Sequence, residues 1–307
     1  MRIVPLIASA TEIVHALGLG EFQVGRSHEC DYPLSVSSLP VCTRPRFDIE
    51  GDSREIDQRV KETLRDAESV YEVFDDVLDR LQPTHILTQT QCKVCAVSLD
   101  DVERALGSRY STRPQVVALE PNSLGDIWKD IRRVADACGV QDRGTELIAD
   151  SKRRMLEISE KAHATGLAPR VVCIEWHQPL MAAGNWVPQL VEMLGARNLC
   201  GIAGGHSPWM SWQELSAVNP DVIVSMPCGF DLARTRAELR WLTENTAWPE
   251  LKAVKDQRAY IADGNQFFNR PGPRVVESLE ILAEMLFPDA FPPAHEGGAW
   301  ERIPANS

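Results

Sequence analysis

The sequence lacks the features of several well-known classes of protein. No apolar run approaches the ~18 residues that a membrane-spanning helix needs, so we expect no direct insertion into a membrane. Residues 1–12 contain a single arginine, a short apolar run and Pro5, without the long hydrophobic region of a secretory signal peptide. We therefore expect this chain to be cytoplasmic.

Nucleotide-binding and serine-hydrolase motifs are missing as well. There is no G-x-x-x-x-G-K-[ST] stretch, and no G-x-G-x-x-G follows the first expected strand. The nucleophile-elbow pattern G-x-S-x-G is also absent. The chain thus lacks the marks of a nucleotide-using enzyme or a serine hydrolase, and we expect no nucleotide cofactor.

Positive charge is scarce, and cysteines do not form a disulfide pattern. The 32 Lys and Arg residues are outnumbered by 44 Asp and Glu, which gives a net charge of -12 and argues against nucleic acid as a partner. Eight cysteines in a long cytoplasmic chain are expected to be mostly reduced thiols. Four of them are expected to act as small buried apolar residues: Cys42, Cys138, Cys173 and Cys200.

The residues that are present predict an α/β fold. Apolar runs at 2–7, 85–87 and 116–119 predict strands, and the apolar spacing over 53–67 predicts a helix. Strand and helix alternate, which predicts a parallel sheet with helices on both faces. We also expect a strand over Gln23–Arg26, and a helix capped by Ser9 and Glu12 in a capping box.

No strand is predicted between residues 123 and 166. One helix is expected around Leu124–Val134, and a second of about 23 residues, roughly 35 Å long, over 142–164. Strands resume at 171–174, 221–225 and 258–262. The expected organisation is an N-terminal αβ lobe (1–122), a helical connector (123–167), a C-terminal αβ lobe (168–288) and a tail that frays (289–307).

Polar loops follow the predicted strands. In open α/β sheets, ligands bind at the carboxyl ends of the strands, and clefts between domains are preferred sites. If the two lobes face one another, the loops line a single cleft. These loops are Ser27–Tyr32, Gln91–Cys95, Glu175–His177, Met226–Phe230 and Gly264–Arg270.

The Cys92-x-x-Cys95 loop has three competing interpretations. It could be a redox dithiol, because a helix is predicted to start close by and would lower a thiol pKa. It could supply half of a metal site with Cys30 and His28, although the spacing matches no established zinc pattern. It could also form part of the lip of a binding cleft. Cys228 is either a small turn residue or a further group in the same cleft.

Aromatic residues are concentrated in the second half. Four tryptophans lie within 37 residues: Trp176, Trp186, Trp209 and Trp212. Core packing explains one or two of them, and the group as a whole predicts a wall for a flat ligand. Asn265, Asn269 and Arg270 add groups that suit carboxylate, phosphate or amide partners.

Several motifs together resemble a known family. Residues 5–20, Asn219-Pro-Asp-Val-Ile-Val224 and Arg270-Pro-Gly-Pro-Arg274 are similar to periplasmic-binding-protein-type domains for vitamin B12 and iron–siderophores, and the resemblance covers about residues 2–288. It implies two Rossmann-like αβα lobes joined by a single long helix, as in class III substrate-binding proteins. Within the family, the chain looks most like cobalamin-binding proteins, on the motifs Cys30–Pro33, Thr88–Ser98, Glu175-Trp176, Met226–Phe230 and Phe268–Arg274.

The resemblance implies a cobalamin or related corrinoid as a ligand, held by a non-enzymatic binding protein. Tyr32 and Trp209 match positions that contact the corrin. The axial cobalt ligand is expected to be His28 or a thiol, with His28 the slightly favoured candidate. The other expected ligand-binding residues are Cys92, Cys95, Glu175, Trp176, Trp186, Cys228, Asn265, Asn269 and Arg270.

Two departures from the exported relatives bear on the partner. There is no signal peptide, and Gln213, next to Glu214, stands where exported relatives place a glutamate that docks on the membrane transporter. A cytoplasmic corrinoid carrier therefore fits better than an exported protein that delivers its ligand to an ABC transporter. The candidate partners are a corrinoid enzyme and an ABC transporter. Two alternatives stay open: a metal-binding or redox protein using Cys30, Cys92, Cys95 and Cys228, and an iron–siderophore binding component.

Overall fold

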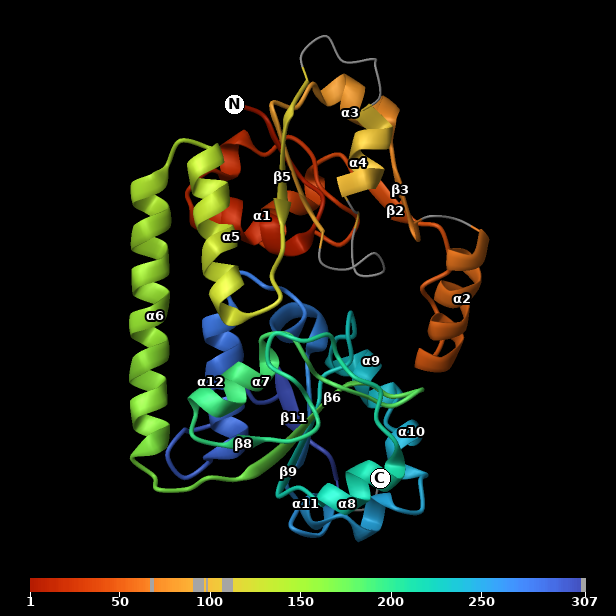
Figure 1. The fold of residues 1–307 in the computed structure, drawn as a ribbon, viewed down its shortest axis with the longest axis vertical. Coiled ribbons are helices and arrows are strands. Elements are labelled where there is room, and N and C mark those ends of the chain that lie inside the picture. Colours follow the sequence, from red (N-terminus) through yellow and green to blue (C-terminus); the bar gives the residue numbers. More distant parts are fainter. Residues whose placement is uncertain (67–68, 91–96, 98, 107–112, 305–307) are drawn as a thin grey trace. The chain divides into compact units, whose positions relative to one another are not determined.

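The computed structural model describes residues 1–66, 69–90, 97, 99–106 and 113–304 (Figure 1). These residues form two compact units. Unit 1 comprises Met1–Gly51, Glu55–Pro121 and Gly125–Asp150. Unit 2 comprises Asp52–Arg54, Asn122–Leu124 and the chain from Ser151 onward. The boundary between Asp150 and Ser151 therefore falls inside the long helix α6 (Gln141–His163).

The main sheet of unit 1 is parallel, as the alternation of strands and helices predicts. Over the described part of the chain, it has the order β1 (Ile3–Pro5), β4 (His85–Gln89), β5 (Gln115–Leu119). Both pairings are parallel, and β5 forms one edge of the sheet. β2 (Thr43–Pro45) and β3 (Tyr71–Val73) form a separate antiparallel pair.

The helices of unit 1 follow the apolar spacing of the sequence. α5 (Leu124–Ala137) buries Ile127, Ile131 and Val134 on one face, which confirms the helix expected there. The core includes Leu6, Ile86, Val102 and other apolar residues of the strands and helices. The remaining helical elements of this unit are α1 (Ala8–Ala16), η1 (Gly20–Phe22), η2 (Leu34–Ser38), α2 (Ser53–Asp66), α3 (Asp75–Leu81) and α4 (Leu99–Leu106).

The sheet of unit 2 is larger and mixed. Within the described residues, its order is β11 (Trp300–Arg302), β10 (Ala259–Ala262), β9 (Val222–Ser225), β6 (Arg170–Trp176), β7 (Met181–Ala182), and β8 (Arg197–Asn198) also pairs with β6. The pairs β6–β9 and β9–β10 are parallel. Their carboxyl ends therefore lie at one edge of the sheet. Every residue of β9 and β10 is buried, as expected for central parallel strands covered on both faces.

The rest of unit 2 consists mainly of helices. α12 (Val275–Leu286) is almost entirely buried and contacts both α7 and the single π-helical turn η4. No helix that the structure describes is both long and apolar enough to cross a membrane. The other helical elements are α7 (Val187–Met193), α8 (Trp212–Val218), α9 (Leu232–Ala237), α10 (Arg240–Thr243), η3 (Trp248–Glu250), α11 (Lys252–Lys255) and η4 (Gly264–Phe268).

Two local expectations are wrong. α1 begins at Ala8, and its N-cap is Ile7 with no side-chain hydrogen bond, so Ser9 and Glu12 form no capping box. Because the helix starts one residue before Ser9, Ser9 lies in its first turn, and both side chains are buried. The segment Gln23–Arg26 contributes isolated bridges, Ile3 with Gln23 and Arg26 with Val41, rather than a strand.

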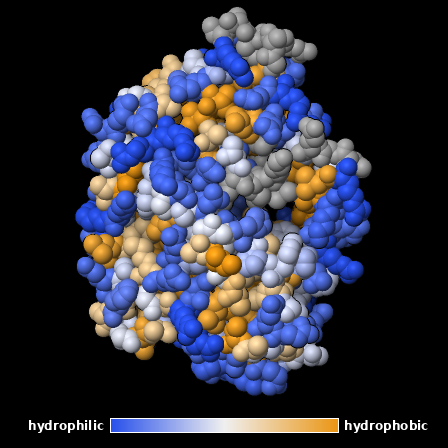
Figure 2. Space-filling view, in the orientation of Figure 1, coloured by the Kyte–Doolittle hydropathy of each residue, from blue (hydrophilic) through white to orange (hydrophobic). Residues whose placement is uncertain are grey.

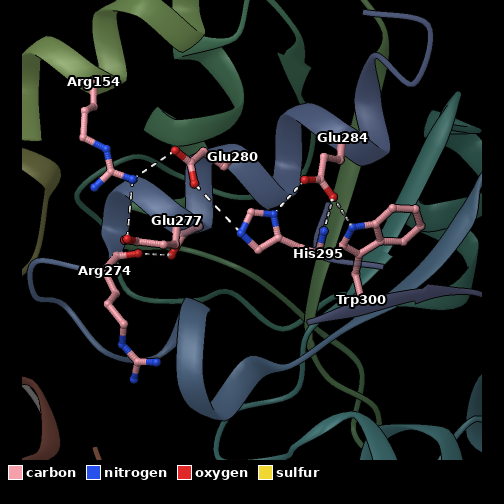
Figure 3. Close-up of polar contacts among 8 residues, drawn as sticks. Arg154, Arg274, Glu277, Glu280, Glu284, His295 and Trp300 are labelled. Atoms are coloured by element: carbon pink, nitrogen blue, oxygen red, sulfur yellow. Dashed lines mark hydrogen bonds and ion pairs between the residues drawn. The ribbon is translucent and has the colours of Figure 1, made fainter. Parts of the chain in front are cut away.

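The expectation that the tail frays from residue 289 is also wrong for its described part. β11 pairs antiparallel with β10, and Trp300 packs edge-on against Tyr260. A carboxylate on α12 holds the segment: Glu284 accepts hydrogen bonds from the indole Nε1 of Trp300 at 2.7 Å and from the backbone N–H of His295 at 3.1 Å (Figure 3). Burial of a tryptophan and saturation of a buried carboxylate outweigh the Pro- and Gly-rich composition of this stretch.

Candidate functional site

The carboxyl edge of the unit 2 sheet brings three predicted loops together. Backbone hydrogen bonds connect them in series: the N–H of Cys228 donates to the carbonyl of Glu175, and the N–H of Asn265 donates to the carbonyl of Phe230, both at 3.0 Å. Gly264 is needed at this junction, because a Cβ there would lie 2.1 Å from the carbonyl oxygen of Pro227. The ends of β6, β9 and β10 therefore form one continuous polar edge, which we call the unit 2 edge.

Glu175 lies on β6, at one end of the unit 2 edge. The hydroxyl of Ser207 donates to its Oε2 at 2.7 Å, and the N–H of Gly184 donates to Ser207 at 3.1 Å. Burial raises the pKa of the Glu175 carboxyl, and the hydrogen bond from Ser207 opposes that rise only in part. This carboxyl is thus biased toward its neutral form, which can both donate and accept a hydrogen bond.

Trp176 and His177 continue from Glu175 and have different environments. The Trp176 ring is partly exposed and contacts the ring of Phe230, with 5.2 Å between centroids. The guanidinium of Arg234 lies 4.1 Å from the centroid of the same Phe230 ring. His177 is buried, its Nε2 lies 2.6 Å from the hydroxyl of Ser225, and burial lowers its pKa to about 4. Trp176 is therefore available at the edge, whereas His177 is a neutral residue below it.

The predicted polar residues after β10 are held within their own loop. The side-chain amide of Asn269 donates to the carbonyl of Gly264 at 2.8 Å, and Arg270 lies 3.3 Å from Asn265 Oδ1. Arg270 is only 4% exposed. Asp263 caps η4 by accepting from the N–H of Gln266 at 2.7 Å, and burial raises the pKa of its carboxyl. A π-helical turn at the end of a central strand is a feature often found at functional sites.

The four tryptophans of the second half separate into exposed and buried ones. The indole of Trp209 is 58% exposed, and the backbone of Trp209 bridges to Met181 of β7. Trp186 is 5% exposed, and Trp212 packs against the core of unit 2. The structure thus offers Trp176 and Trp209 as aromatic surfaces, while Trp186 and Trp212 serve packing.

The loop Ser27–Tyr32 of unit 1 is built around His28. The hydroxyl of Thr43 lies 2.8 Å from His28 Nδ1 and accepts a hydrogen bond from the His28 backbone N–H at 3.1 Å. The ring of Tyr71 lies 5.5 Å away, between centroids. Burial first, and then the positive charge of Arg26, lower the pKa of His28 to about 4. At neutral pH the imidazole is therefore uncharged and able to coordinate a metal.

The other predicted residues of this loop differ in exposure. Tyr32 is 46% exposed, so it presents aromatic surface to solvent. Cys30 is 1% exposed and accepts a hydrogen bond from the Thr11 hydroxyl at 3.0 Å. Burial raises the pKa of the Cys30 thiol, which disfavours the thiolate that metal binding or redox chemistry requires.

Cys92 and Cys95 lie outside the described residues, so the competing interpretations of their loop stay predictions. Within the described ranges, no group of three or more His, Cys, Asp or Glu side chains could hold a metal ion. None of the six cysteines in those ranges forms a disulfide. Cys42, Cys138 and Cys173 are buried as expected, whereas Cys200 and Cys228 are partly exposed.

Sequence reasoning missed the residues that support the site from a distance. Thr43 and Tyr71 contact His28, and Ser207 and Gly184 hold Glu175, yet none stands in a motif. They contact the site only because strands separated in the sequence are paired in the fold. The run of glycines between Gly201 and Gly205 was the one local signal of a tightly packed loop near Glu175.

Glu214 has a structural partner. It is the N3 residue of a capping box on α8, in which its Oε2 accepts from the Ser211 N–H at 2.7 Å and from the Ser211 hydroxyl at 2.8 Å. The Ser211 hydrogen bonds lower the pKa of the Glu214 carboxyl. This carboxylate therefore stabilises the start of α8.

Comparisons with known proteins support the same kind of fold over nearly the whole chain. Residues 3–265 match the family model described as periplasmic binding protein. An uncharacterised ABC transporter substrate-binding lipoprotein of Bacillus subtilis is 25% identical, over 94% of this chain and 81% of that protein. The vitamin B12-binding protein of Vibrio cholerae is 23% identical, over 93% of this chain and 88% of that protein.

Solved structures with the same fold include binders of two tetrapyrrole-type ligands. A periplasmic heme-binding protein from Pseudomonas aeruginosa superposes with a TM-score of 0.70 at 20% identity, covering 94% of this chain and 93% of that one. The periplasmic vitamin B12-binding protein of Vibrio cholerae superposes with a TM-score of 0.66 at 18% identity, covering 93% and 96%. At these identities the likeness establishes the fold.

Proposed function

Because the chain belongs to the periplasmic binding protein family, a family of non-enzymatic ligand binders, we propose that it binds a corrinoid. The observation that carries the proposal is the exposed indole of Trp209, whose backbone bridges to Met181 opposite Trp176, together with Trp176 itself and the carboxyl of Glu175. A flat, amphipathic macrocycle needs aromatic surface for its face and neutral polar groups for its amide periphery. The similarity to a vitamin B12-binding protein points to the same ligand class.

His28 is the proposed axial ligand of the cobalt ion. Its imidazole is neutral at neutral pH, and Thr43 engages Nδ1, which leaves Nε2 as the coordinating nitrogen. A hydrogen bond to the ring nitrogen that does not bind metal fixes the orientation of a ligating histidine. Tyr32, exposed in the same loop, supplies a second aromatic surface.

Titration with hydroxocobalamin tests the proposal. We expect a saturable change in the visible spectrum when the purified protein is mixed with hydroxocobalamin, and we expect His28→Ala to remove the part of the change that reports axial exchange. Absence of any heat or spectral change at micromolar protein would sink the corrinoid proposal. A response to hemin alone would assign the site to haem, whose iron also takes a histidine ligand. A response to a ferric siderophore alone would assign it to siderophore binding.

A pair of variants separates stacking on Trp209 from general effects. Trp209→Ala is expected to weaken hydroxocobalamin binding by roughly tenfold or more, because a stacked aromatic contributes on the order of 1–2 kcal/mol. Leu167→Ala is the matched control, since Leu167 is 59% exposed and Trp209 is 58% exposed, both in unit 2. Equal affinities for the two variants would remove Trp209 from the site.

We propose a cytoplasmic carrier that hands its ligand to a corrinoid enzyme or to an ABC transporter. Free thiols support a reducing compartment. The capping role of Glu214 supports a departure from the docking arrangement that the resemblance implies for exported relatives. Cell fractionation tests the location, and recovery of the protein outside the cytoplasm would overturn it.

Stoichiometric zinc or iron after chelator-free purification would instead favour the thiol-based metal site with Cys30, Cys92, Cys95 and Cys228.

A further inference from the structure

The outer edge of β5 in unit 1 is half covered and half open. In the parallel pairing with β4, the N–H of Gln115 donates to the Thr84 carbonyl and the carbonyl of Leu119 accepts from Thr90. Backbone groups of alternate residues in a strand point the same way, so those of Val116 and Ala118 point away from β4. Of the five residues of β5, two therefore direct their N–H and C=O groups away from the sheet.

An ion pair on α5 covers the carboxyl half of this edge. Arg133 donates to the carbonyl of Ala118 at 2.8 Å and pairs with Asp130 at 2.5 Å. Asp130 in turn accepts from the N–H of Glu120 at 2.9 Å. These contacts saturate the edge from the Ala118 carbonyl onward, as natural proteins do to protect edge strands.

The amino half of the same edge lies in a pocket. Among the described residues, the N–H and C=O of Val116 and the N–H of Ala118 have no hydrogen-bond partner. An open groove of about 710 Å³ is lined by residues of β5 and α5, including Arg133, and β5 runs along α5 (Figure 1). Its lining residues are Gln115, Val116, Val117, Ala118, Lys129, Arg132, Arg133, Asp136 and Ala137.

The groove is lined by more cations than carboxylates, on a chain of net charge -12. Lys129, Arg132 and Arg133 line it, against a single carboxylate, Asp136. Lys129 and Arg133 pair with Asp126 and Asp130, which lie outside the lining. Arg132 has no partner within the described part of the chain. The surface over α5 is correspondingly hydrophilic in Figure 2.

We propose that an extended, acidic segment of a partner protein adds to β5 as a further strand. Three backbone hydrogen bonds, two to Val116 and one to Ala118 N–H, would fix its register. A carboxylate of the added strand would reach Arg132, since Lys129 already pairs with Asp126. Strand addition to an open edge is a common mode of peptide recognition, in which backbone bonds supply affinity and side chains supply specificity. The ion pair of Arg133 limits the site to the amino half of β5.

A pair of blocked pentapeptides tests the proposal on the full chain by amide NMR. One alternates valine with glutamate, and the other alternates valine with lysine. The glutamate peptide is expected to shift the Val116 and Ala118 amide signals and to protect them from hydrogen exchange, whereas the lysine peptide leaves them unchanged. A glutamate peptide with proline at the central position cannot pair and is expected not to bind. If the proline peptide bound as tightly as the glutamate peptide, charge attraction alone would explain binding, and strand addition would be overturned.

Variants of the groove supply the second arm. Arg132→Glu is expected to lower the affinity for the glutamate peptide by about fivefold, which corresponds to the free energy of one exposed ion pair. Arg65→Glu on α2 is the control and is expected to leave that affinity unchanged. Val116→Pro removes an outward N–H that the sheet does not use, so the fold persists and peptide binding is lost. Protection of the Val116 amide in the free protein, a concentration-dependent dimer in sedimentation, or unchanged binding to Arg132→Glu would each overturn the proposal.

Discussion

The unit 2 edge and the Ser27–Tyr32 loop of unit 1 hold their candidate residues by different means. On the unit 2 edge, backbone hydrogen bonds connect three loops, and Gly264 packs directly against the backbone of Pro227. In the unit 1 loop, side-chain hydrogen bonds hold the candidate residues: Thr43 contacts His28, and Thr11 contacts Cys30. A site held by backbone is rigid and costly to alter, whereas a site held by side chains can change residue by residue. The following predictions test that contrast.

The largest effect is expected from Gly264→Ala. A Cβ at this position would lie 2.1 Å from the Pro227 carbonyl oxygen and 2.6 Å from that of Met226, and backbone cannot move aside cheaply. We expect unit 2 to lose roughly 3 kcal/mol or more of its free energy of unfolding, measured by denaturant titration. Gly298→Ala is the control, because its nearest atom, the His295 carbonyl oxygen, is 3.8 Å away. Equal stability of the two variants would contradict a backbone-held edge.

Glu284→Ala is expected to destabilise unit 2 nearly as much. The change leaves the buried Trp300 indole N–H without an acceptor and frees the His295 backbone that holds the C-terminal segment. A loss of about 3 kcal/mol is the usual size for breaking a buried charged network. Near-ultraviolet circular dichroism should report the release of Trp300. Glu280→Ala, which removes a more exposed partner of Arg154, should cost about 1 kcal/mol or less.

His28 is expected to make unit 1 less stable in acid. Its pKa is about 4 in the folded protein, below the ordinary histidine value of 6.5, so the unfolded chain binds the proton first as pH falls. Stability therefore decreases between about pH 6.5 and pH 4, by up to roughly 3 kcal/mol for this group alone. Comparing wild type with His28→Gln isolates this contribution from that of Asp130, whose pKa burial raises to about 6. Identical pH profiles would show that His28 is not held as described.

Glu175→Gln is expected to have the smallest effect, with the opposite sign. Burial raises the pKa of Glu175, so the folded protein binds the proton more tightly than the unfolded chain and stability falls as pH rises through the carboxylate range. The isosteric amide has no such loss, so at neutral pH the variant should be as stable as wild type or up to about 1 kcal/mol more stable. A clear destabilisation in thermal unfolding at neutral pH would mean that the charged carboxylate is required.

Much of the fold was predictable because it rests on local pattern. The helices over Leu124–Ala137 and Gln141–His163 and the strands at β4, β5, β6, β9 and β10 follow from apolar periodicity, which burial imposes on any sequence. The motifs that resemble the periplasmic binding protein family indicated the same architecture. The failures were also local: Ser9 and Glu12 fit a capping box by spacing, yet both are buried in α1, and the box lies at Ser211 and Glu214.

The chemical types of the candidate residues were predictable, but their environments were not. The sequence by itself placed Glu175 and Trp176 at the carboxyl end of a strand, where ligands bind, whereas the strand expected before His28 is only a set of isolated bridges. Only the tertiary structure decided that Trp209 is exposed and Trp186 buried, and that Glu175 tends toward its neutral form. The same holds for the C-terminal segment, which is anchored by Glu284. Exposure and pKa depend on neighbours distant in sequence, such as Ser207 for Glu175 and Thr43 for His28, and no local pattern encodes those contacts.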